Sequence, residues 1–357
     1  MSAKQKHTVL DLFCGCGGIS LGFQLAGFDI IGGVDNNEYA TKTFAHNFTK
    51  AKVLCTDITT ITDEQIIDKY NKVDVIVGGP PCQGFSSANR WQKESDDPRN
   101  KLFFEYLRFV KVLNPKVVMI ENVRGLLSRD NGYAKERIIT LLSEMGYSVN
   151  VSILDAAEYG VPQNRKRAIF VAIRKDFRDE IFNFENLKKQ PKVTVSDAIS
   201  ELYDFEQQKG EIATPKATNK YLQYIHGKSK IVSNHEIKYP AEIVQKRISY
   251  VPQGGNWQDV PTELWPNSRE NRHSSAYKRL DPKAQSCTID TGNAHSNYFH
   301  PIFNRIPTVR ESARLQSFND DFIFVGPRGS QYRQVGNAVP PLLAKAVAAE
   351  IKFLLEK

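Results

Sequence analysis

The stretch that decides the fold is VLDLFCGCGGISLGFQLA, residues 9–26. It begins with a short apolar run, Val9 to Phe13, that is typical of a buried strand and ends in closely spaced glycines. From Ile19 to Ala26 the apolar residues recur with helical spacing. A strand that passes through a glycine-rich turn into a helix is the opening of a β-α-β unit. We therefore predict that an α/β fold starts here.

The same alternation continues through the first half of the chain. Further strands are predicted at residues 29–35, 52–58, 73–79, 116–123 and 167–174, and helices at residues 38–48, 64–70, 102–113 and 134–145. Short apolar strands that alternate with amphipathic helices are typical of a parallel sheet covered by helices on both faces. We predict a doubly wound, Rossmann-like α/β sheet, in which ligands bind at the carboxyl ends of the strands.

Residues 176–305 interrupt this pattern. They are rich in Lys, Gln, Asn, Pro and Tyr and hold only short apolar pieces, so we predict a second, smaller and more irregular domain. Helical periodicity returns at residues 308–318. Residues 337–357 predict a long C-terminal helix that is entered through two prolines, which suit the first turn of a helix.

The composition is that of a globular protein with a moderate excess of positive charge. Of 357 residues, 41% are apolar, and 48 basic against 40 acidic side chains leave a formal charge of +8. Such a charge suits a polyanionic partner such as nucleic acid, but many ordinary basic enzymes share it. The polar start MSAKQKHT and the lack of an apolar run of about 18 residues predict neither a signal peptide nor a membrane span. The predicted location is the cytoplasm.

The five cysteines do not form a repeated framework. Their odd number argues against a secreted disulfide scaffold. Cys14 and Cys16 lack the spacing and the second ligand pair of a zinc site, so we predict no metal centre.

The glycine turn is a candidate ligand site. Gly15, Gly17 and Gly18 lie between the first strand and its helix, where small residues let the backbone approach a ligand closely. Their G-x-G-G spacing differs from the G-x-G-x-x-G of dinucleotide-binding proteins. A tight turn without a ligand is the alternative interpretation.

Acidic residues at the next two strand ends sharpen this prediction. Asp35 ends the second strand, where a carboxylate commonly binds ribose hydroxyls, and Asp57 ends the third, where it could accept from an adenine amino group. Phe13 could pack against the purine. The loop carries no basic residue for a pyrophosphate, which favours S-adenosylmethionine over NAD. Each acid taken alone is also a candidate helix N-cap.

Cys82 lies just beyond the fourth predicted strand, in GGPPCQGFS (residues 78–86). Pro80 and Pro81 restrict the backbone before it, as suits a nucleophile that must keep one position. A buried structural thiol is the alternative. Glu121 lies near the end of the neighbouring strand. Because a carboxylate beside a thiol raises the thiol pKa, this carboxyl is better suited to serve a substrate.

Cytosine fits this pair of side chains. A thiolate can add to C6 while a carboxylic acid protonates or hydrogen-bonds N3 and N4, which makes C5 nucleophilic enough to take a methyl group from a sulfonium. A base must then remove the C5 proton so that the cysteine can leave. The residues thus point to methyl transfer onto cytosine.

Six segments resemble, in order, the motifs of the DNA cytosine-5 methyltransferases of bacterial restriction–modification systems. They are DLFCGCGG (11–18), GGPPCQGFS (78–86), ENV (121–123), PQNRKR (162–167), RESARLQSF (310–318) and QVGNAVPP (334–341). The resemblance covers nearly the whole chain outside residues 176–305. It implies a catalytic domain of residues 1–175 and 306–357 that binds S-adenosylmethionine, and a target-recognition domain of residues 176–305.

The resemblance also implies a role for each catalytic residue. Cys82 is the nucleophile, and Glu121 holds and protonates the base. Arg165 is expected to bond the cytosine O2, and Arg167 is expected to bridge to Glu121.

Cofactor contacts follow from the same resemblance. They are Phe13, Gly15, Gly17, Gly18, Asp35, Asn36, Asp57, Ile58, Pro80 and Asn337. Many relatives have Glu at the position of Asp35, and some have an aromatic residue at that of Asn36, where Asn stacks less well on adenine. Asn337 matches a residue that returns to the cofactor pocket, so the C-terminal helix is expected to pack beside the first strand.

Double-stranded DNA is the partner that the resemblance implies. Residues 83–101 match a mobile loop that closes on DNA, with Ser86 and Arg99 at contacting positions, and Thr288 matches a residue that positions the DNA backbone. The target cytosine must leave the duplex to reach Cys82. One chain holds every part that the reaction needs, so we expect a functional monomer, with a cognate restriction endonuclease encoded beside it.

Two alternatives stay open. A tRNA cytosine-5 methyltransferase resembles this chain closely but carries a Cys-Phe-Thr tripeptide that is absent here. A catalytically silent DNA-binding relative would keep the fold, and the intact Cys82, Glu121 and Arg165 argue against it.

Overall fold

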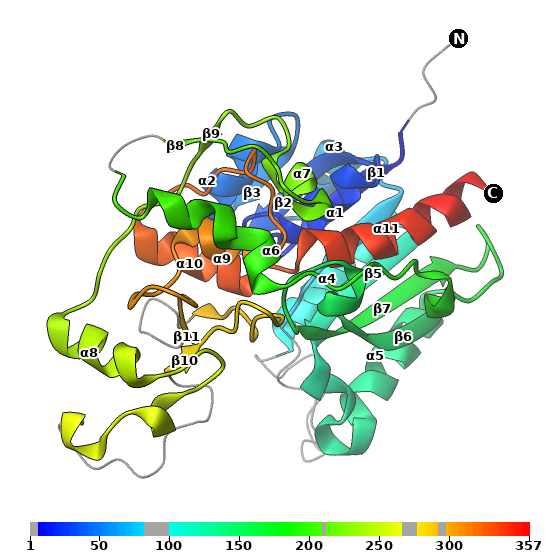
Figure 1. Cartoon of the computed structure of the whole chain (residues 1–357). Helices are drawn as coiled ribbons and strands as arrows, with labels where there is room; N and C mark the ends of the chain where they lie inside the picture. Colours follow the sequence, from blue (N-terminus) through cyan, green and yellow to red (C-terminus); the bar gives the residue numbers. More distant parts are fainter. Residues whose placement is uncertain (1–5, 82–99, 209–211, 266–276, 292–297) are drawn as a thin grey trace. The chain divides into compact units, whose positions relative to one another are not determined.

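The computed structural model describes residues 6–81, 100–208, 212–265, 277–291 and 298–357 (Figure 1). The chain forms two compact units. The first contains the residues up to 155 together with 166–189 and 341–357, and the second contains residues 156–165 and 190–340. Residues 306–340 thus pack with the second unit, whereas the sequence assigns them to the catalytic domain. Within the described ranges, no helix combines the length and the apolar character needed to cross a bilayer.

The first unit is built on a seven-stranded sheet with strand order β3-β2-β1-β4-β5-β7-β6. Its strands are β1 (Thr8–Leu12), β2 (Asp29–Asp35), β3 (Lys52–Cys55), β4 (Val75–Gly78), β5 (Val117–Val123), β6 (Tyr147–Asp155) and β7 (Lys166–Arg174). Strands β1 to β5 are parallel, which confirms the Rossmann-like α/β prediction. Strand β7 instead runs antiparallel between β5 and β6, because residues 156–165 are too few for a crossover helix.

Helices cover both faces of this sheet. They are α1 (Gly18–Leu25), α2 (Glu38–Asn47), α3 (Asp63–Tyr70), α4 (Lys101–Leu113), α5 (Tyr133–Glu144) and α11 (Pro341–Glu356), with the short 3-10 helices η1 (Ile58–Thr60), η4 (Arg124–Leu127), η5 (Arg129–Gly132) and η7 (Phe184–Asn186). Adjacent strand residues point to opposite faces. A Cβ atom on Gly32 would meet Tyr70 of α3, and one on Gly33 would meet Phe44 of α2, so α2 and α3 lie on opposite faces.

The C-terminal helix α11 lies against α1, far away in sequence (Figure 1). A Cβ atom built on Gly22 would lie 2.5 Å from the Cβ atom of Ala344, so only glycine allows this close approach. The Lys352 ammonium donates to the carbonyl of Ala26, 3.1 Å away, at the end of α1. The end of the chain therefore returns to the first strand–helix unit. The helix begins later than predicted, with Pro341 in its first position.

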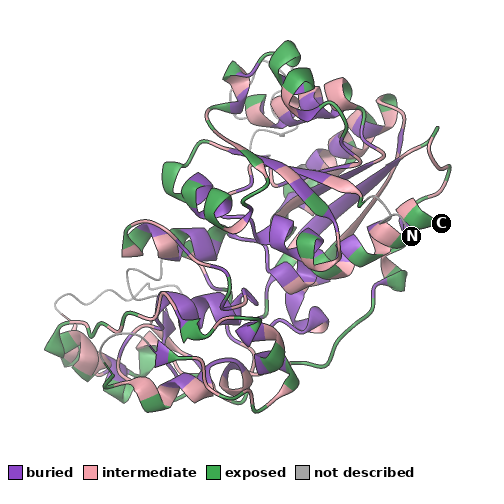
Figure 2. Ribbon diagram, turned by 90° about the horizontal axis from the view of Figure 1, so that it is seen from above, coloured by how far each residue is buried: buried purple, intermediate pink, exposed green. Residues whose placement is uncertain are grey.

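The interior of the first unit is apolar. Strands β4, β5 and β7 are buried along most of their length, and the strands of the sheet are accordingly coloured mainly as buried in Figure 2. Side chains of α3, α4 and α5 pack in the same core. Phe103 and Tyr106 of α4 are fully buried there. Truncating a buried phenylalanine to alanine costs about 3–5 kcal/mol. The well-packed sheet thereby fixes the loops at its carboxyl edge.

The second unit has short elements rather than one large sheet, in agreement with its irregular sequence. Its helices are α6 (Val195–Ile199), α7 (Lys220–His226), α8 (Glu242–Tyr250), α9 (Val309–Leu315) and α10 (Arg328–Asn337), with 3-10 helices η6 (Ala156–Tyr159), η8 (Ser200–Phe205), η9 (Trp257–Asp259) and η10 (Thr262–Leu264). Two strand pairs complete it, β8 (Ile212–Ala213) with β9 (Ile231–Val232) and β10 (Lys278–Arg279) with β11 (Tyr298–Phe299).

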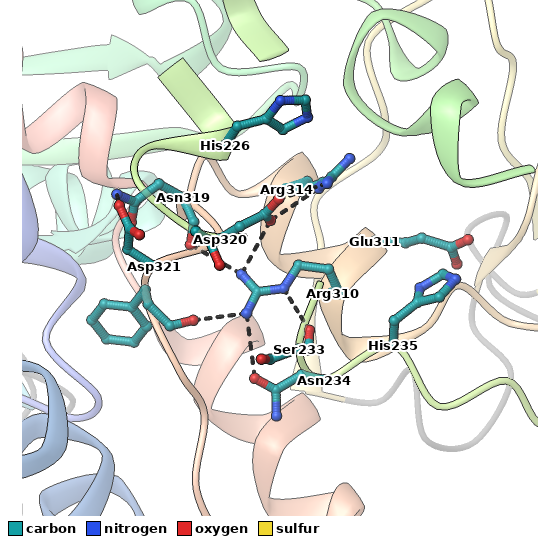
Figure 3. A network of polar contacts seen from close by, with 12 residues as sticks. His226, Ser233, Asn234, His235, Arg310, Glu311, Arg314, Asn319, Asp320 and Asp321 are labelled. Atoms are coloured by element: carbon teal, nitrogen blue, oxygen red, sulfur yellow. Dashed lines mark hydrogen bonds and ion pairs between the residues drawn. The ribbon is translucent and has the colours of Figure 1, made fainter. Parts of the chain in front are cut away.

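Arginines occupy the interior of the second unit. Arg310 is fully buried, and its guanidinium donates to the main-chain carbonyls of Ser233 and Phe322, each 2.8 Å away (Figure 3). Arg314 is also fully buried and pairs with Asp320 at 2.6 Å. Buried charges are tolerated only when they are paired and hydrogen-bonded. Each buried arginine therefore depends on its partners for the stability of the unit.

Candidate active site

The strand order reverses between β1 and β4, and ligands of open α/β sheets bind at such a point. Strands β2 and β3 extend the sheet on one side of β1, and β5 extends it beyond β4. The register pairs Leu12 with Gly78, and Gly78 with Ile120. The glycine loop, the segment after β4 and Glu121 therefore come together at one edge of the sheet, as predicted from their places after the strands.

The glycine loop has an unusual backbone. Phe13, Gly15 and Gly17 all have positive φ angles, of 58°, 50° and 100°. A bulky residue such as Phe13 adopts this conformation only where the surroundings enforce it. A Cβ atom on Gly15 would meet no atom within 4 Å, whereas one on Gly17 would clash with Phe48. The loop thus presents an open, side-chain-free surface at Gly15 that fits a closely approaching ligand.

Asp35 ties the end of β2 to this loop. Its Oδ2 atom accepts from the backbone N–H of Gly15 at 2.9 Å, and its Oδ1 atom accepts from that of Asn37 at 2.8 Å. Each carboxylate oxygen has a second lone pair, which suits a ribose hydroxyl. Asn36, the neighbouring predicted contact, is exposed.

Asp57 serves as the N-cap of η1. Its Oδ1 atom accepts from the backbone N–H of Thr59 at 2.9 Å, and this bond lowers the carboxyl pKa. Arg108 of α4 stabilises the same segment. Its Nη2 atom donates to the carbonyl of Ile58 at 3.3 Å and to that of Ile61 at 2.7 Å. Strand β3 ends at Cys55, earlier than predicted, and Asp57 begins the next turn of the chain as the N-cap of η1. Arg108 is not among the residues predicted from sequence.

Glu121 forms an ion pair with Arg167. The Nε atom of Arg167 lies 2.8 Å from Oε1 of Glu121, and both side chains are 14% exposed. The structure thus contains the bridge expected between these residues. A Cβ atom on Gly79 would lie 3.1 Å from Oε2 of Glu121, so glycine leaves room for the carboxylate beside the segment that leads to Cys82.

Arg165 lies in the second unit and is buried there. Its Nη1 atom donates to the carbonyl of Ile289 at 2.8 Å and its Nη2 atom to that of Gly336 at 2.9 Å. Gly336 precedes Asn337, an exposed residue at the end of α10. Arg167 contacts Glu121, and the bond from Arg165 to a cytosine O2 stays a prediction.

Asn122 holds the chain just before the predicted nucleophile. Its side-chain amide donates to the carbonyl of Pro80 at 3.0 Å. Sequence reasoning missed this residue, although it directly follows Glu121 in ENV. Cys82 lies outside the described residues, as do Ser86 and Arg99.

Three of the described thiols, Cys14, Cys16 and Cys287, are poor alternatives to Cys82. Burial raises the pKa of Cys14 and of Cys16 well above the usual range for a thiol. Burial also raises the pKa of Cys287 to about 11. Because the thiolate is the reactive form, these cysteines are inert near neutral pH. These three cysteines have the properties of structural thiols.

Thr288 is exposed in the second unit, where its hydroxyl donates to the carbonyl of Asn164 at 2.9 Å. The neighbouring backbone N–H of Ile289 donates to the side chain of Gln163 at 2.8 Å. Residues 163–165 and 286–289 thus hold each other in place. The DNA contact expected of Thr288 stays a prediction.

Comparisons with known proteins agree with this arrangement. A model of the C-5 cytosine-specific DNA methylase family matches residues 7–353. The chain is 37% identical to the Type II methyltransferase M.DdeI of Desulfomicrobium norvegicum, over 98% of this chain and 89% of that protein. It is 38% identical to the Type II methyltransferase M1.HphI of Haemophilus parahaemolyticus, over 96% of this chain and 86% of that protein.

A solved structure resembles the whole chain. A prophage-encoded protein of E. coli, assigned as a DNA modification methyltransferase, matches with a TM-score of 0.81 and 29% identity, over 99% of this chain and 100% of that one. DNA methyltransferases of this fold take their methyl group from S-adenosylmethionine, and the open glycine loop with Asp35 fits that cofactor. The chain therefore belongs to the C-5 cytosine-specific DNA methylase family.

Proposed function

We propose that this enzyme methylates C5 of a cytosine that is turned out of a specific short sequence in duplex DNA, through a transient bond between Cys82 and C6. The observation that carries the proposal is the ion pair between Glu121 and Arg167, beside Gly79 at the carboxyl edge of the sheet. It supports a site in which a carboxyl group is held rigidly for a substrate. Because C6 is not accessible within the base stack, the cytosine must leave the duplex to react with Cys82.

Each side chain has a defined part in the reaction. The thiolate of Cys82 adds to C6, and the electron pair of the C5–C6 double bond makes C5 nucleophilic while Glu121 gives a proton to N3. The bound S-adenosylmethionine supplies the methyl group. A base then removes the C5 proton, the C6–S bond breaks with its electron pair returning to sulfur, and N3 gives its proton back to Glu121.

Two contacts support a fixed geometry for these steps. Arg167 holds Oε1 of Glu121, which sets the direction of the carboxyl group. Asn122 holds the carbonyl of Pro80, which restrains the approach to Cys82. Since catalytic groups must stay within fractions of an ångström of their productive positions, we infer that both contacts position the reacting atoms.

The methyl donor is proposed to bind along the first three strand ends. Phe13, Gly15, Gly17 and Gly18 would face its amino-acid and adenine parts, Asp35 and Asn36 its ribose, and Asp57, Ile58, Pro80 and Asn337 the remaining edges. The open surface at Gly15 and the bond from Gly15 to Asp35 support this assignment.

Arg165 is proposed to bond the cytosine O2. Its Nη1 and Nη2 atoms hold the carbonyls next to Thr288 and Asn337. These contacts support a fixed guanidinium for that bond.

Duplex DNA is proposed to be read by residues 176–305 and contacted by Ser86, Arg99 and Thr288. The relatives M.DdeI and M1.HphI are Type II methyltransferases, which supports a modification enzyme with a cognate endonuclease. We propose that one chain acts as a monomer.

A trapping experiment tests the mechanism. A duplex with 5-fluorocytosine in the target should form a covalent complex with the wild type in the presence of S-adenosylmethionine, because fluorine cannot leave as a proton. The Cys82→Ala variant should bind DNA and cofactor but form no complex. Absence of a complex with the wild type, under conditions where tritiated methyl groups do reach ordinary duplex DNA, would overturn the covalent route. Methyl transfer to tRNA alone would overturn the DNA assignment.

A further inference from the structure

A buried carboxyl group lies behind the glycine loop, and the proposed reaction does not use it. Asp11, near the end of β1, is only 1% exposed. Its Oδ2 atom accepts from the hydroxyl of Ser20 in the first turn of α1 at 2.7 Å. Its Oδ1 atom is buried and has no hydrogen-bond partner among the described residues. An isolated buried carboxylate is unfavourable, so this group needs either a proton or a compensating charge.

The groups around Asp11 supply no such charge. Asp35 at the end of β2, Cys14 and Cys16 in the loop and Tyr106 of α4 are the titratable groups that interact with it in the described part of the chain. None of them is a cation, and Asp35 repels a negative charge on Asp11. Burial, together with this repulsion, raises the pKa of Asp11 to about 7, although the Ser20 bond lowers it.

We propose that Asp11 is the internal counter-charge of the cofactor site, which is partly protonated when the site is empty and loses its proton when the cationic cofactor binds. The inference rests on the proposed cofactor site at the glycine loop. S-adenosylmethionine carries a sulfonium and an α-ammonium group, and a nearby positive charge favours the ionised form of a carboxyl group. The O–H bond of Asp11 breaks, its electron pair stays on oxygen, and the proton passes to the buffer.

The proposal predicts a proton count that depends on pH. With a pKa of about 7, Asp11 is half protonated in the empty enzyme at that pH, so binding releases about half a proton. The release approaches one proton at lower pH and vanishes above about pH 8.5. Because the proton competes with the cofactor, the dissociation constant should rise up to about tenfold for each pH unit below 7.

Isothermal titration calorimetry in two buffers of different ionisation heat measures this release directly. At neutral pH the wild type should release more protons on binding S-adenosylmethionine than the Asp11→Asn variant does. The α-amino group of the ligand also titrates near pH 8, but it contributes equally to both proteins. S-adenosylhomocysteine, which lacks the sulfonium charge, should release fewer protons from the wild type.

The Ser20→Ala variant separates this role from a purely structural one. It keeps the carboxyl group but removes the bond that lowers its pKa, so it should release more protons than the wild type at neutral pH. A packing role for Ser20 would leave the proton count unchanged. This variant also tests the proposal if Asp11→Asn fails to fold, as judged by circular dichroism.

The outcomes are distinct. Equal proton release by wild type, Asp11→Asn and Ser20→Ala, with cofactor binding retained, would overturn the counter-charge and leave the cofactor site intact. Failure of the wild type to bind S-adenosylmethionine would overturn the proposed site itself, and the inference with it.

Discussion

The interiors of the two units differ in their chemical character. In the first, residues such as Phe103 and Ile120 form an apolar core, and polar side chains gather at the carboxyl edge of the sheet. In the second, Arg305 and Arg314 lie fully buried with carboxylate partners. An apolar core tolerates many volume-conserving changes, whereas a buried ion pair is damaged by the loss of either partner. The buried ion pairs of the second unit therefore stabilise its fold, whereas the pair of Glu121 and Arg167 in the first unit lies at the proposed site.

The largest effect is expected from charge at the edge of the first unit. Glu121→Gln keeps the size of the side chain but removes the proton that it gives to N3. We expect methyl transfer to fall about 10²–10⁴-fold, as is typical for loss of a general acid. Tritium transfer to duplex DNA measures the rate, and urea unfolding separates this loss from any destabilisation caused by breaking the ion pair with Arg167.

Glu38→Gln is the matched control. Glu38 also pairs with a basic side chain, Lys42, but on the exposed surface of α2. Its replacement should leave the methylation rate unchanged. Near-normal turnover by Glu121→Gln would show that edge charge in the first unit does not serve catalysis.

A large structural effect is expected in the second unit. Arg314→Met removes a buried cation that contacts Asp320 at 2.6 Å and Glu201 at 2.7 Å, and leaves both carboxylates without it. We expect a loss of about 3–5 kcal/mol in the free energy of unfolding. Denaturant unfolding followed by fluorescence measures this loss.

Lys42→Met breaks an exposed pair of the first unit and provides the comparison. Exposed pairs contribute about 0–1 kcal/mol, so this variant should unfold almost as the wild type does. Equal losses in the two variants would contradict the distinction between the two interiors.

The contrast also explains how much of the structure could be predicted from sequence. Apolar periodicity predicts β1 to β5 and their helices, because each strand is recognisable from its neighbours along the chain. It misses β6, whose alternating YSVNVSILD is a recognisable edge-strand pattern. It cannot reveal that Arg314 is buried, because its partner Glu201 lies 113 residues away. Charged residues at helical spacing look like a solvated face until such partners are known.

In the candidate site, too, some contacts could be predicted from sequence and others could not. The pair of Glu121 and Arg167 is predictable because both residues lie in motifs with a known resemblance, next to predicted strands. The contacts of Arg165 with two carbonyls are not predictable, since main-chain partners leave no mark in a sequence. Asp11 lies inside a motif as well, yet only burial reveals that its charge is uncompensated.

Lowering the pH should destabilise the second unit and stabilise the first. Burial lowers the pKa of His235 and of His300 in the second unit. Because the unfolded chain then binds more protons, stability should fall as the pH drops below about 6.5, the usual histidine value. The raised pKa of Asp11, about 7, has the reverse sign. The folded first unit holds a proton that the unfolded chain lacks between about pH 4 and 7, so its stability should rise as the pH falls through this range.

Hydrogen exchange measured by mass spectrometry resolves the two responses. Between about pH 7 and 5.5, corrected for intrinsic exchange, peptides from β1 should gain protection by about 1.5 kcal/mol, whereas peptides from α9 should lose protection. Asp11→Asn should abolish the first change and His300→Asn should reduce the second. Changes of the same sign in both units would contradict the opposed titrations.

The smallest effect is expected at Arg108, a charged residue that both stabilises the fold and supports the proposed cofactor site. Arg108 sits on α4 in the first unit and holds the carbonyls of Ile58 and Ile61, behind the proposed adenine contacts. Lysine keeps the charge but cannot make all of these bonds. Because one hydrogen bond contributes about 1 kcal/mol, Arg108→Lys should raise the KM for S-adenosylmethionine about fivefold and leave kcat unchanged. Arg178→Lys, whose guanidinium lies 3.6 Å from Glu180, is the matched control and should change neither constant. A fall in kcat with an unaltered KM would instead place Arg108 among the residues that position the reacting base.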